Sequence, residues 1–223
     1  MPLETIELET APNPVATVIV LHGLGADGND FVPIAKELDL TSVGPVRFVF
    51  PSAPQRPVTI NGGYVMRAWY DILGTEMARR EDEAGLREAQ AQVNALIERE
   101  RVRGIPASRV VLAGFSQGCA VALLTGLRHG ERLAGLLGMS GYLPLAGHTA
   151  AERSAANAGI PIFQAHGTAD PMIVIGRATA TRDELLALGY PVEWHSYPMP
   201  HSVCAEEIAD MNAWLLRVLK NTP

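Results

Sequence analysis

The sequence lacks most of the features that mark secreted, membrane-spanning or metal-binding proteins. Only two of its 223 residues are cysteines, which is too few for a disulfide framework, and Cys119 and Cys204 have no metal-ligand spacing. No apolar run reaches the ~18 residues that a membrane span needs. The N-terminus has no basic segment followed by an apolar stretch, so a standard export signal is not indicated. We therefore predict a cytoplasmic chain without a transmembrane segment and with both cysteines reduced.

Positive charge is also scarce. Lys and Arg total 18 against 24 Asp and Glu, which gives a net charge of −6, and no block of basic residues occurs. Nucleic acid is therefore not an expected partner. Apolar residues make up 48% of the chain, which is enough for a sizeable core. We expect residues 1–223 to form one domain.

Strand-like and helix-like segments alternate along the whole chain. This alternation predicts an α/β fold with a mainly parallel central sheet and helices on both faces. In such sheets ligands bind at the carboxyl ends of the strands. The predicted strands are Leu3–Leu8 (an edge strand), Thr17–Leu21, Val46–Phe50, Val110–Leu112, Gly135–Met139, Ile162–His166 and Val192–Tyr197. The predicted helices are one capped by Asp30 and ending at Leu38, then Glu83–Arg101, Ala120–Leu127, Arg177–Leu188 and Ala205–Leu219.

Residues 51–80 stand apart from this pattern. They are rich in Pro, Gly and aromatic residues and show no clear period. A loop of this length inside a compact domain is usually functional. We predict that it lines a pocket or forms a lid.

One serine lies between a predicted strand and a predicted helix, in the pattern G-x-S-x-G. Gly114 and Gly118 flank Ser116 at two positions on either side. A strand that turns sharply into a helix crowds its backbone at those positions, so a Cβ there would collide. The turn exposes the hydroxyl at the start of a helix, where free N–H groups favour developing negative charge. The pattern predicts a nucleophile, although an ordinary glycine-rich turn with an exposed serine fits the same residues.

A nucleophilic serine needs a base and a group that orients it, and this architecture supplies them in the order Ser, acid, His. Asp170 and His201 each follow a predicted strand in that order. Asp170 could instead cap a turn, and His201 could be a solvated loop residue. His166 also ends a predicted strand. His195 lies inside one, where a packed or edge position is expected.

Acyl transfer also needs donors for the tetrahedral oxyanion. One predicted donor is the backbone N–H of Gln117, the residue after the serine, and the other is that of Leu24 in the glycine-rich loop 22–28. His22 is interpreted as a structural hydrogen-bonding residue. The loop lacks the glycine patterns of nucleotide-binding sites.

Several segments together resemble the carboxylesterase and acyl-protein thioesterase (lysophospholipase-like) family of α/β-hydrolases. They are "LHGLGADGNDF", "PSAPQRPVTINGGYVMRAWYDI", "GFSQGCAVAL", "HGTADPMI" and "PMPHSVCAEEI", in collinear order over nearly the whole chain. The resemblance implies a serine esterase or thioesterase with no metal and no cofactor. It assigns the nucleophile, acid and base to Ser116, Asp170 and His201, and the oxyanion amides to Leu24 and Gln117. It also implies that Trp69 lies beside the acyl pocket, either on its wall or in the core.

Two positions depart from the family pattern. Cys119 replaces the second glycine that usually ends the elbow, and Pro200 precedes His201 where a small residue is expected. Cys119 could be an alternative nucleophile, but inside a helix and without a base it is interpreted as a core residue.

The expected activity is hydrolysis of a small acyl ester or thioester, with an acylated protein or a lysophospholipid as further substrate candidates. The alternatives are a catalytically silent acyl-binding protein of the same fold and a lysophospholipase. The resemblance makes a homodimer plausible.

Overall fold

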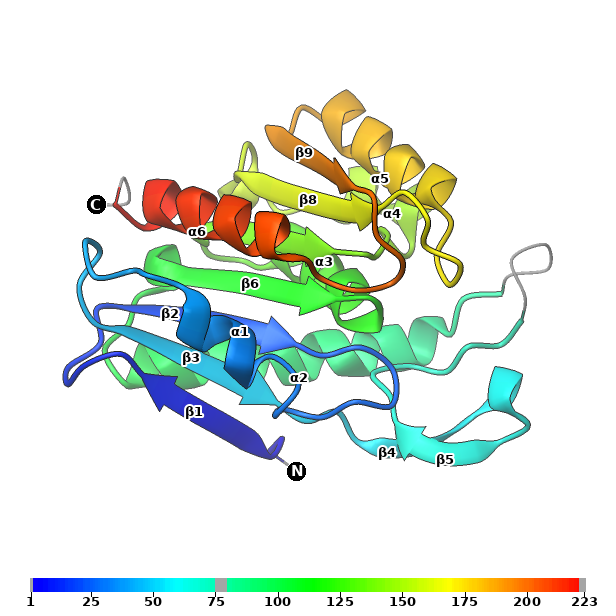
Figure 1. The fold of residues 1–223 in the computed structure, drawn as a ribbon. Helices are drawn as coiled ribbons and strands as arrows, with labels where there is room; N and C mark the ends of the chain where they lie inside the picture. The colour runs from blue at the N-terminus through cyan, green and yellow to red at the C-terminus, as the bar shows by residue number, and fades with distance from the viewer. Residues whose placement is uncertain (1, 75–79, 221–223) are drawn as a thin grey trace.

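The computed structural model describes residues 2–74 and 80–220, which form a seven-stranded sheet between two layers of helices (Figure 1). The strand order is β1-β3-β2-β6-β7-β8-β9. The outermost strand, β1, pairs antiparallel with β3, and the other neighbours pair in parallel. The sheet strands are β1 Thr5–Glu9, β2 Ala16–Leu21, β3 Val46–Pro51, β6 Val110–Phe115, β7 Gly135–Met139, β8 Ile162–Gly167 and β9 Val192–Tyr197. The α-helices are α1 Val32–Glu37, α2 Glu83–Val102, α3 Gln117–Arg128, α4 Ala146–Glu152, α5 Ile175–Ala187 and α6 Ala205–Lys220. Short 3₁₀ turns cover Thr59–Asn61, Ala107–Arg109 and Ala155–Asn157.

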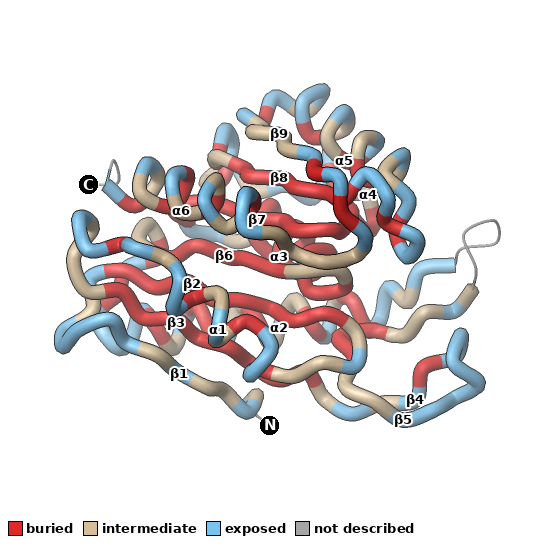
Figure 2. Tube along the Cα trace, viewed as in Figure 1, coloured by how far each residue is buried: buried red, intermediate tan, exposed pale blue. Residues whose placement is uncertain are grey.

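The central strands are buried on both faces, as their continuous apolar runs predict (Figure 2). In β2, Ile19 and Leu21 pack into one apolar cluster with α2, α3 and α5. Val18 and Val20 point the other way, into a second cluster with α1 and α6. The predicted α/β fold with helices on both faces is therefore confirmed. Among the described residues, no helix is both long and apolar enough to cross a membrane.

The start of α1 differs from the prediction. Asp30 does not cap this helix: the N-cap position is Phe31, and no side chain caps it. Pro33 lies in the first turn, where a proline needs no N–H partner. The Asp27 carboxylate instead accepts a hydrogen bond from the Asn29 backbone N–H at 2.8 Å and closes the preceding turn. The short helix α4 was not predicted.

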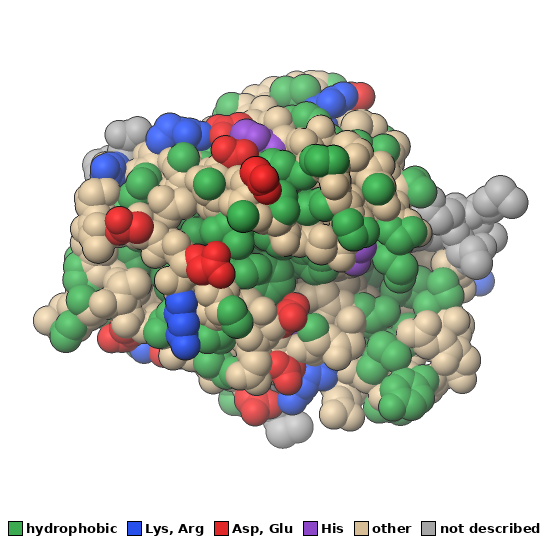
Figure 3. Space-filling view, in the orientation of Figure 1, with side chains coloured by type: hydrophobic (Ala, Val, Ile, Leu, Met, Phe, Trp, Pro, Cys, Tyr) green, Lys and Arg blue, Asp and Glu red, His purple; other side chains and the backbone are tan. Residues whose placement is uncertain are grey.

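Within the predicted loop at residues 51–80, the described residues 51–74 contain regular structure. They contain an antiparallel hairpin of β4 (Gln55–Val58) and β5 (Tyr64–Arg67), separate from the main sheet. The hairpin lies beyond the carboxyl ends of the parallel strands, toward which the arrows of β2, β6 and β8 point in Figure 1. Hydrophobic side chains gather over it in Figure 3, and Tyr64 and Val65 are exposed. Positions 75–79 of the predicted loop lie outside the described residues.

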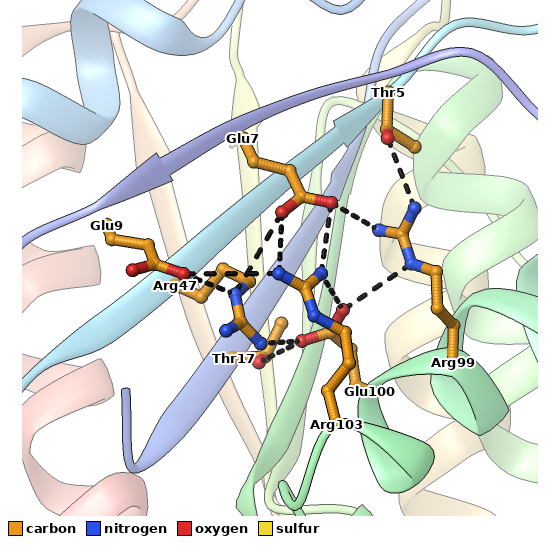
Figure 4. Close-up of polar contacts among 8 residues, drawn as sticks. All are labelled: Thr5, Glu7, Glu9, Thr17, Arg47, Arg99, Glu100 and Arg103. Atoms are coloured by element: carbon orange, nitrogen blue, oxygen red, sulfur yellow. Dashed lines mark hydrogen bonds and ion pairs between the residues drawn. The ribbon is translucent and has the colours of Figure 1, made fainter. Parts of the chain in front are cut away.

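A cluster of charged side chains joins the edge of the sheet to the end of α2 (Figure 4). At its centre the fully buried Glu100 carboxylate accepts hydrogen bonds from Arg47 at 2.7 Å, Arg103 at 2.9 Å and Thr17 at 2.9 Å. Arg103 also pairs with Glu7 of β1 at 2.9 Å. Because Glu100 has three donors, its burial is compensated, and it links β1, β2, β3 and α2.

Removing the buried carboxylate should destabilise the protein. In Glu100→Ala the Arg47 guanidinium, whose side chain is 8% exposed, loses its buried partner, so we expect the free energy of unfolding to fall by about 3 kcal/mol. Glu98→Ala on the same helix removes only an exposed pair with Arg101 and should leave the unfolding midpoint nearly unchanged. Urea unfolding followed by circular dichroism measures both variants. Equal midpoints would show that the cluster does not stabilise the fold.

Candidate active site

Ser116 lies at the apex of a sharp turn between β6 and α3. Its backbone has φ 55° and ψ −117°, a strained conformation for a residue with a side chain. A Cβ on Gly114 would overlap the Gly118 carbonyl, and a Cβ on Gly118 would overlap the carbonyls of Leu21 and His22. The predicted backbone crowding is therefore present at both glycines. At Gly118, however, the backbone that lies against the glycine belongs to the end of β2 and not to β6. Both glycines let α3 approach the sheet closely enough to hold Ser116 in the turn.

Asp170 and His201 form a hydrogen-bonded pair at the same end of the sheet. The His201 Nδ1 and Asp170 Oδ2 atoms are 2.6 Å apart. The other oxygen, Oδ1, accepts hydrogen bonds from the Met172 N–H at 2.8 Å and the Ile173 N–H at 2.9 Å. The carboxylate is fully buried, and its hydrogen-bond donors compensate that burial. This arrangement fixes the carboxylate. Asp170 contacts only the Nδ1 side of the His201 ring, so Nε2 is available for another partner.

The backbone of the two loops explains how the pair is positioned. The Thr168 N–H donates to the Tyr197 carbonyl at 2.8 Å, and the Ala169 N–H donates to the Met199 carbonyl at 3.2 Å. Gly167 faces the carbonyls of Met199 and Pro200 so closely that a Cβ would collide with them. The loop after β8 and the loop after β9 are therefore joined along their backbones, and Pro200 is part of this contact.

The remaining histidines near the sheet have structural partners. His166 is fully buried, and its Nε2 donates to the Ile173 carbonyl at 2.7 Å. Burial lowers its pKa, so the ring is neutral. His195 lies in the edge strand, as predicted, with its nitrogens 3.0 Å from Glu193 and 3.2 Å from Asp210. Neither ring lines the pocket that contains Ser116.

That pocket has a volume of about 420 Å³. Ser116, His201, Leu24 and Gln117 all line it, so the structure brings four of the six predicted site residues to one cavity. Asp170 lies behind His201. The walls also contain residues that sequence analysis did not identify, and these come mainly from the hairpin region and from the loops after β7 and β8. They include Ile60, Tyr70, Ile72, Phe115, Tyr142, Met172 and Ile173, with Asp30, Asp71, Arg80, Glu81 and Asp82 as charged members.

Comparison with known proteins agrees with this geometry. A family model described as Phospholipase/Carboxylesterase matches residues 4–219. The chain belongs to the phospholipase/carboxylesterase family. It is 38% identical to acyl-protein thioesterase 1 of Yarrowia lipolytica over 226 residues, covering 98% of this chain and 99% of the relative.

Solved structures agree as well. The crystal structure of Arabidopsis thaliana SOBER1 is 30% identical with a TM-score of 0.86, over 92% of this chain and 99% of that one. Zea mays acyl-protein thioesterase 2 is 28% identical with a TM-score of 0.85, over 97% of this chain and 99% of that one. This member of the phospholipase/carboxylesterase family is therefore a hydrolase, and the catalytically silent alternative is not favoured.

Trp69 has a different place from the pocket wall that the family resemblance suggested. Its side chain is fully buried and is not among the residues that line the pocket. The indole N–H donates to the His22 carbonyl at 2.9 Å, which turns the ring into the core. The neighbouring Tyr70 takes the wall position, and its hydroxyl lies 2.6 Å from that of Tyr142, which also lines the pocket.

Cys119, which replaces the usual glycine of this family, lies inside the core. It is 1% exposed, and burial raises the pKa of its thiol to about 12. A Cβ added to Gly138 or Gly141 would lie within 2.8 Å of its sulfur. The thiol therefore fills space that these two glycines leave open. It has neither the exposure nor the ionisation of a nucleophile.

Cys119 should therefore be dispensable for hydrolysis. Because a pKa of about 12 leaves only about one thiol in ten thousand ionised at pH 8, iodoacetamide should not modify Cys119 in the folded protein. Cys119→Ala should retain the hydrolysis rate and lose about 1 kcal/mol of stability through the small cavity it creates. Mass spectrometry, ester hydrolysis and urea unfolding measure the three quantities. Loss of hydrolysis in a folded Cys119→Ala protein would contradict the assignment.

Proposed function

We propose that this chain hydrolyses carboxylic esters and thioesters through an acyl-enzyme on Ser116. The observation that carries the proposal is the Asp170–His201 pair beside the pocket that holds the strained Ser116. In this proposal the chain works as one α/β-hydrolase domain. No step requires a metal ion or a cofactor.

Each step has an assigned group. The Ser116 hydroxyl oxygen attacks the carbonyl carbon of the substrate while His201 Nε2 takes its proton. Asp170 holds the imidazole in the tautomer protonated on Nδ1 and stabilises the imidazolium that forms. His201 then protonates the leaving alcohol or thiol. A water molecule, deprotonated by the same nitrogen, then attacks the acyl-enzyme. The bond between the Ser116 oxygen and the acyl carbon breaks, His201 returns the proton to the serine oxygen, and the acid leaves.

The negative charge on the tetrahedral intermediate needs donors that are already in position. The amide of Gln117 is at the first residue of α3, where a helix has no internal acceptor for it. Leu24 lies in the loop after β2 and lines the same pocket as Gln117. Within the described residues no hydrogen bond of the Leu24 amide to another protein group is found. We propose that these two N–H groups bind the oxyanion.

For the substrate, we propose an acyl thioester carried by a protein. Two observations support this choice. Relatives that match nearly the full length of the chain carry the name acyl-protein thioesterase. The pocket also combines apolar walls for an acyl chain, such as Ile72 and Ile173, with charged groups at residues 80–82 that suit a polar leaving group. A lysophospholipid would use the same apolar walls, so it is the competing substrate.

Replacing the nucleophile tests the proposed activity directly. Ser116→Ala should lower kcat for a short-chain p-nitrophenyl ester and for a palmitoyl thioester by about 10⁶-fold, because no acyl-enzyme can form. A fluorophosphonate probe should label the unmodified protein at Ser116 and should not label the variant. Hydrolysis at an undiminished rate in Ser116→Ala would exclude this mechanism, and a palmitoyl lysophospholipid cleaved faster than the thioester would exclude the substrate.

Replacing the acid tests the role of the buried pair. In Asp170→Asn, the amide oxygen can still accept from Met172 and Ile173, so its NH₂ group faces His201 Nδ1. The ring must then carry its proton on Nε2, where it cannot act as a base, and kcat should fall on the order of 10⁴-fold. Asp210→Asn is the matched control, because Asp210 also lies beside a histidine, at 3.2 Å from His195. The control should keep the full rate. Equal rates in the two variants would contradict the role of Asp170.

A further inference from the structure

Trp69 lies between the two loops that supply the proposed oxyanion amides. Its indole N–H donates to the His22 carbonyl at 2.9 Å, two residues before Leu24. Its backbone N–H donates to the side-chain oxygen of Gln117 at 2.8 Å. One buried residue therefore contacts both loops through two different N–H groups. Trp69 itself is not among the residues that line the pocket.

The Gln117 side chain completes the connection. Its NH₂ group donates to the Tyr70 carbonyl at 2.7 Å, so both ends of the amide are used on the 69–70 backbone. The residue is 3% exposed. A buried amide with partners at both ends is held in one orientation. The backbone N–H of the same residue is one of the two oxyanion donors, so its side chain anchors the donor directly.

His22 fixes the other loop in the same way. Its Nε2 accepts a hydrogen bond from the Ala53 N–H at 2.9 Å, so Nδ1 carries the proton and donates to the Gly23 carbonyl at 2.6 Å. Burial lowers its pKa, and the ring stays neutral. The loop continues through Gly25, at φ +80°, whose N–H donates to the Arg67 carbonyl at 2.8 Å. The Leu24 amide is thus held from both sides, by Trp69 through His22 and by the hairpin through Gly25.

We propose that Trp69 and the side chain of Gln117 are positioning residues that set the distance between the two oxyanion amides. This inference rests on the proposed function. Donors act on a transition state only when they are already placed within a few tenths of an ångström of the developing charge. The loop at residues 23–25 contains two glycines and would otherwise have freedom to move. The path His22–Trp69–Gln117 removes that freedom, and neither His22 nor Trp69 lines the pocket.

Two variants break the path at different points. Trp69→Phe keeps an aromatic ring but loses the bond to the His22 carbonyl. Gln117→Met keeps the length of the side chain and the backbone N–H but loses both side-chain hydrogen bonds. Trp214→Phe is the matched control, because Trp214 is also buried, at 2% exposed, but packs in the cluster on the opposite face of the sheet.

The ligands are a matched pair with the same acyl chain. A trifluoromethyl ketone adds to Ser116 and places an oxyanion between the two amides, whereas the methyl ketone binds without forming it. In both variants we expect kcat to fall by about 10- to 100-fold, less than for deletion of a donor. The trifluoromethyl ketone should bind more weakly by the same factor, while KM and methyl ketone affinity stay within about twofold. The pH profile of kcat should not move, because His201 and Asp170 are unchanged.

A double-mutant cycle separates positioning from general loss of stability. Either change breaks the same path. The kcat of the double variant should therefore equal that of the less active single variant, and the two effects should not multiply. The proposal is overturned if Trp69→Phe and Gln117→Met fold with unchanged trifluoromethyl ketone affinity, or if both ketones and the Trp214→Phe control weaken equally. Failure of the proposed function would look different, since the unmodified protein itself would then lack Ser116-dependent hydrolysis.

Discussion

The close approach of α3 to the ends of β2 and β6 is the constraint on which the site depends. Two positions without a side chain, Gly114 and Gly118, allow backbone to pass against backbone there. The chain must then turn through Ser116 with a positive φ, which costs on the order of 1–3 kcal/mol. The buried core around α3 offsets that cost, because nearly all of the helix is buried. The strain, the exposed hydroxyl and the free N–H groups at the start of α3 therefore have one cause.

The region between β3 and α2 has a larger role than covering the site. The Trp69 backbone N–H donates to the Gln117 side chain at the start of α3. The Tyr70 hydroxyl contacts that of Tyr142 in the loop after β7. The Asp71 N–H donates to Asp82, the residue before α2, at 2.8 Å. These contacts are mostly buried polar ones, which are direction-specific and costly to break singly. The pocket wall is thus fixed relative to Ser116, and substrate selectivity can reside in exposed side chains such as Ile60 without disturbing the donors.

Much of the fold could be predicted from the sequence, because the apolar pattern of the central strands agrees with their burial in the structure. The run at 17–21 is apolar without interruption and is indeed buried on both faces. The pairing of Asp170 with His201 was also predictable, since parallel strands bring their carboxyl ends to one edge. The hairpin was not, because β4 and β5 do not join the main sheet and their alternation is interrupted by proline and glycine. The position of Trp69 was left open between the wall and the core, because a sequence does not reveal which of two adjacent aromatics turns inward.

The hydrogen bonds of the histidines around the site support the proposed role of His201 as the base. His22 uses both nitrogens on backbone groups, and His166 uses Nε2 on the Ile173 carbonyl. His201 uses Nδ1 on a buried carboxylate and rests its ring against Phe115, with ring centroids 4.7 Å apart. That leaves Nε2 without a carboxylate partner, and His201 lines the same pocket as Ser116. Among the described residues, no lysine or arginine is a hydrogen-bond partner of Asp170, so in the proposed mechanism its charge is left to stabilise the imidazolium. A guanidinium at the same place, as at Glu100, would neutralise the carboxylate permanently and weaken that effect.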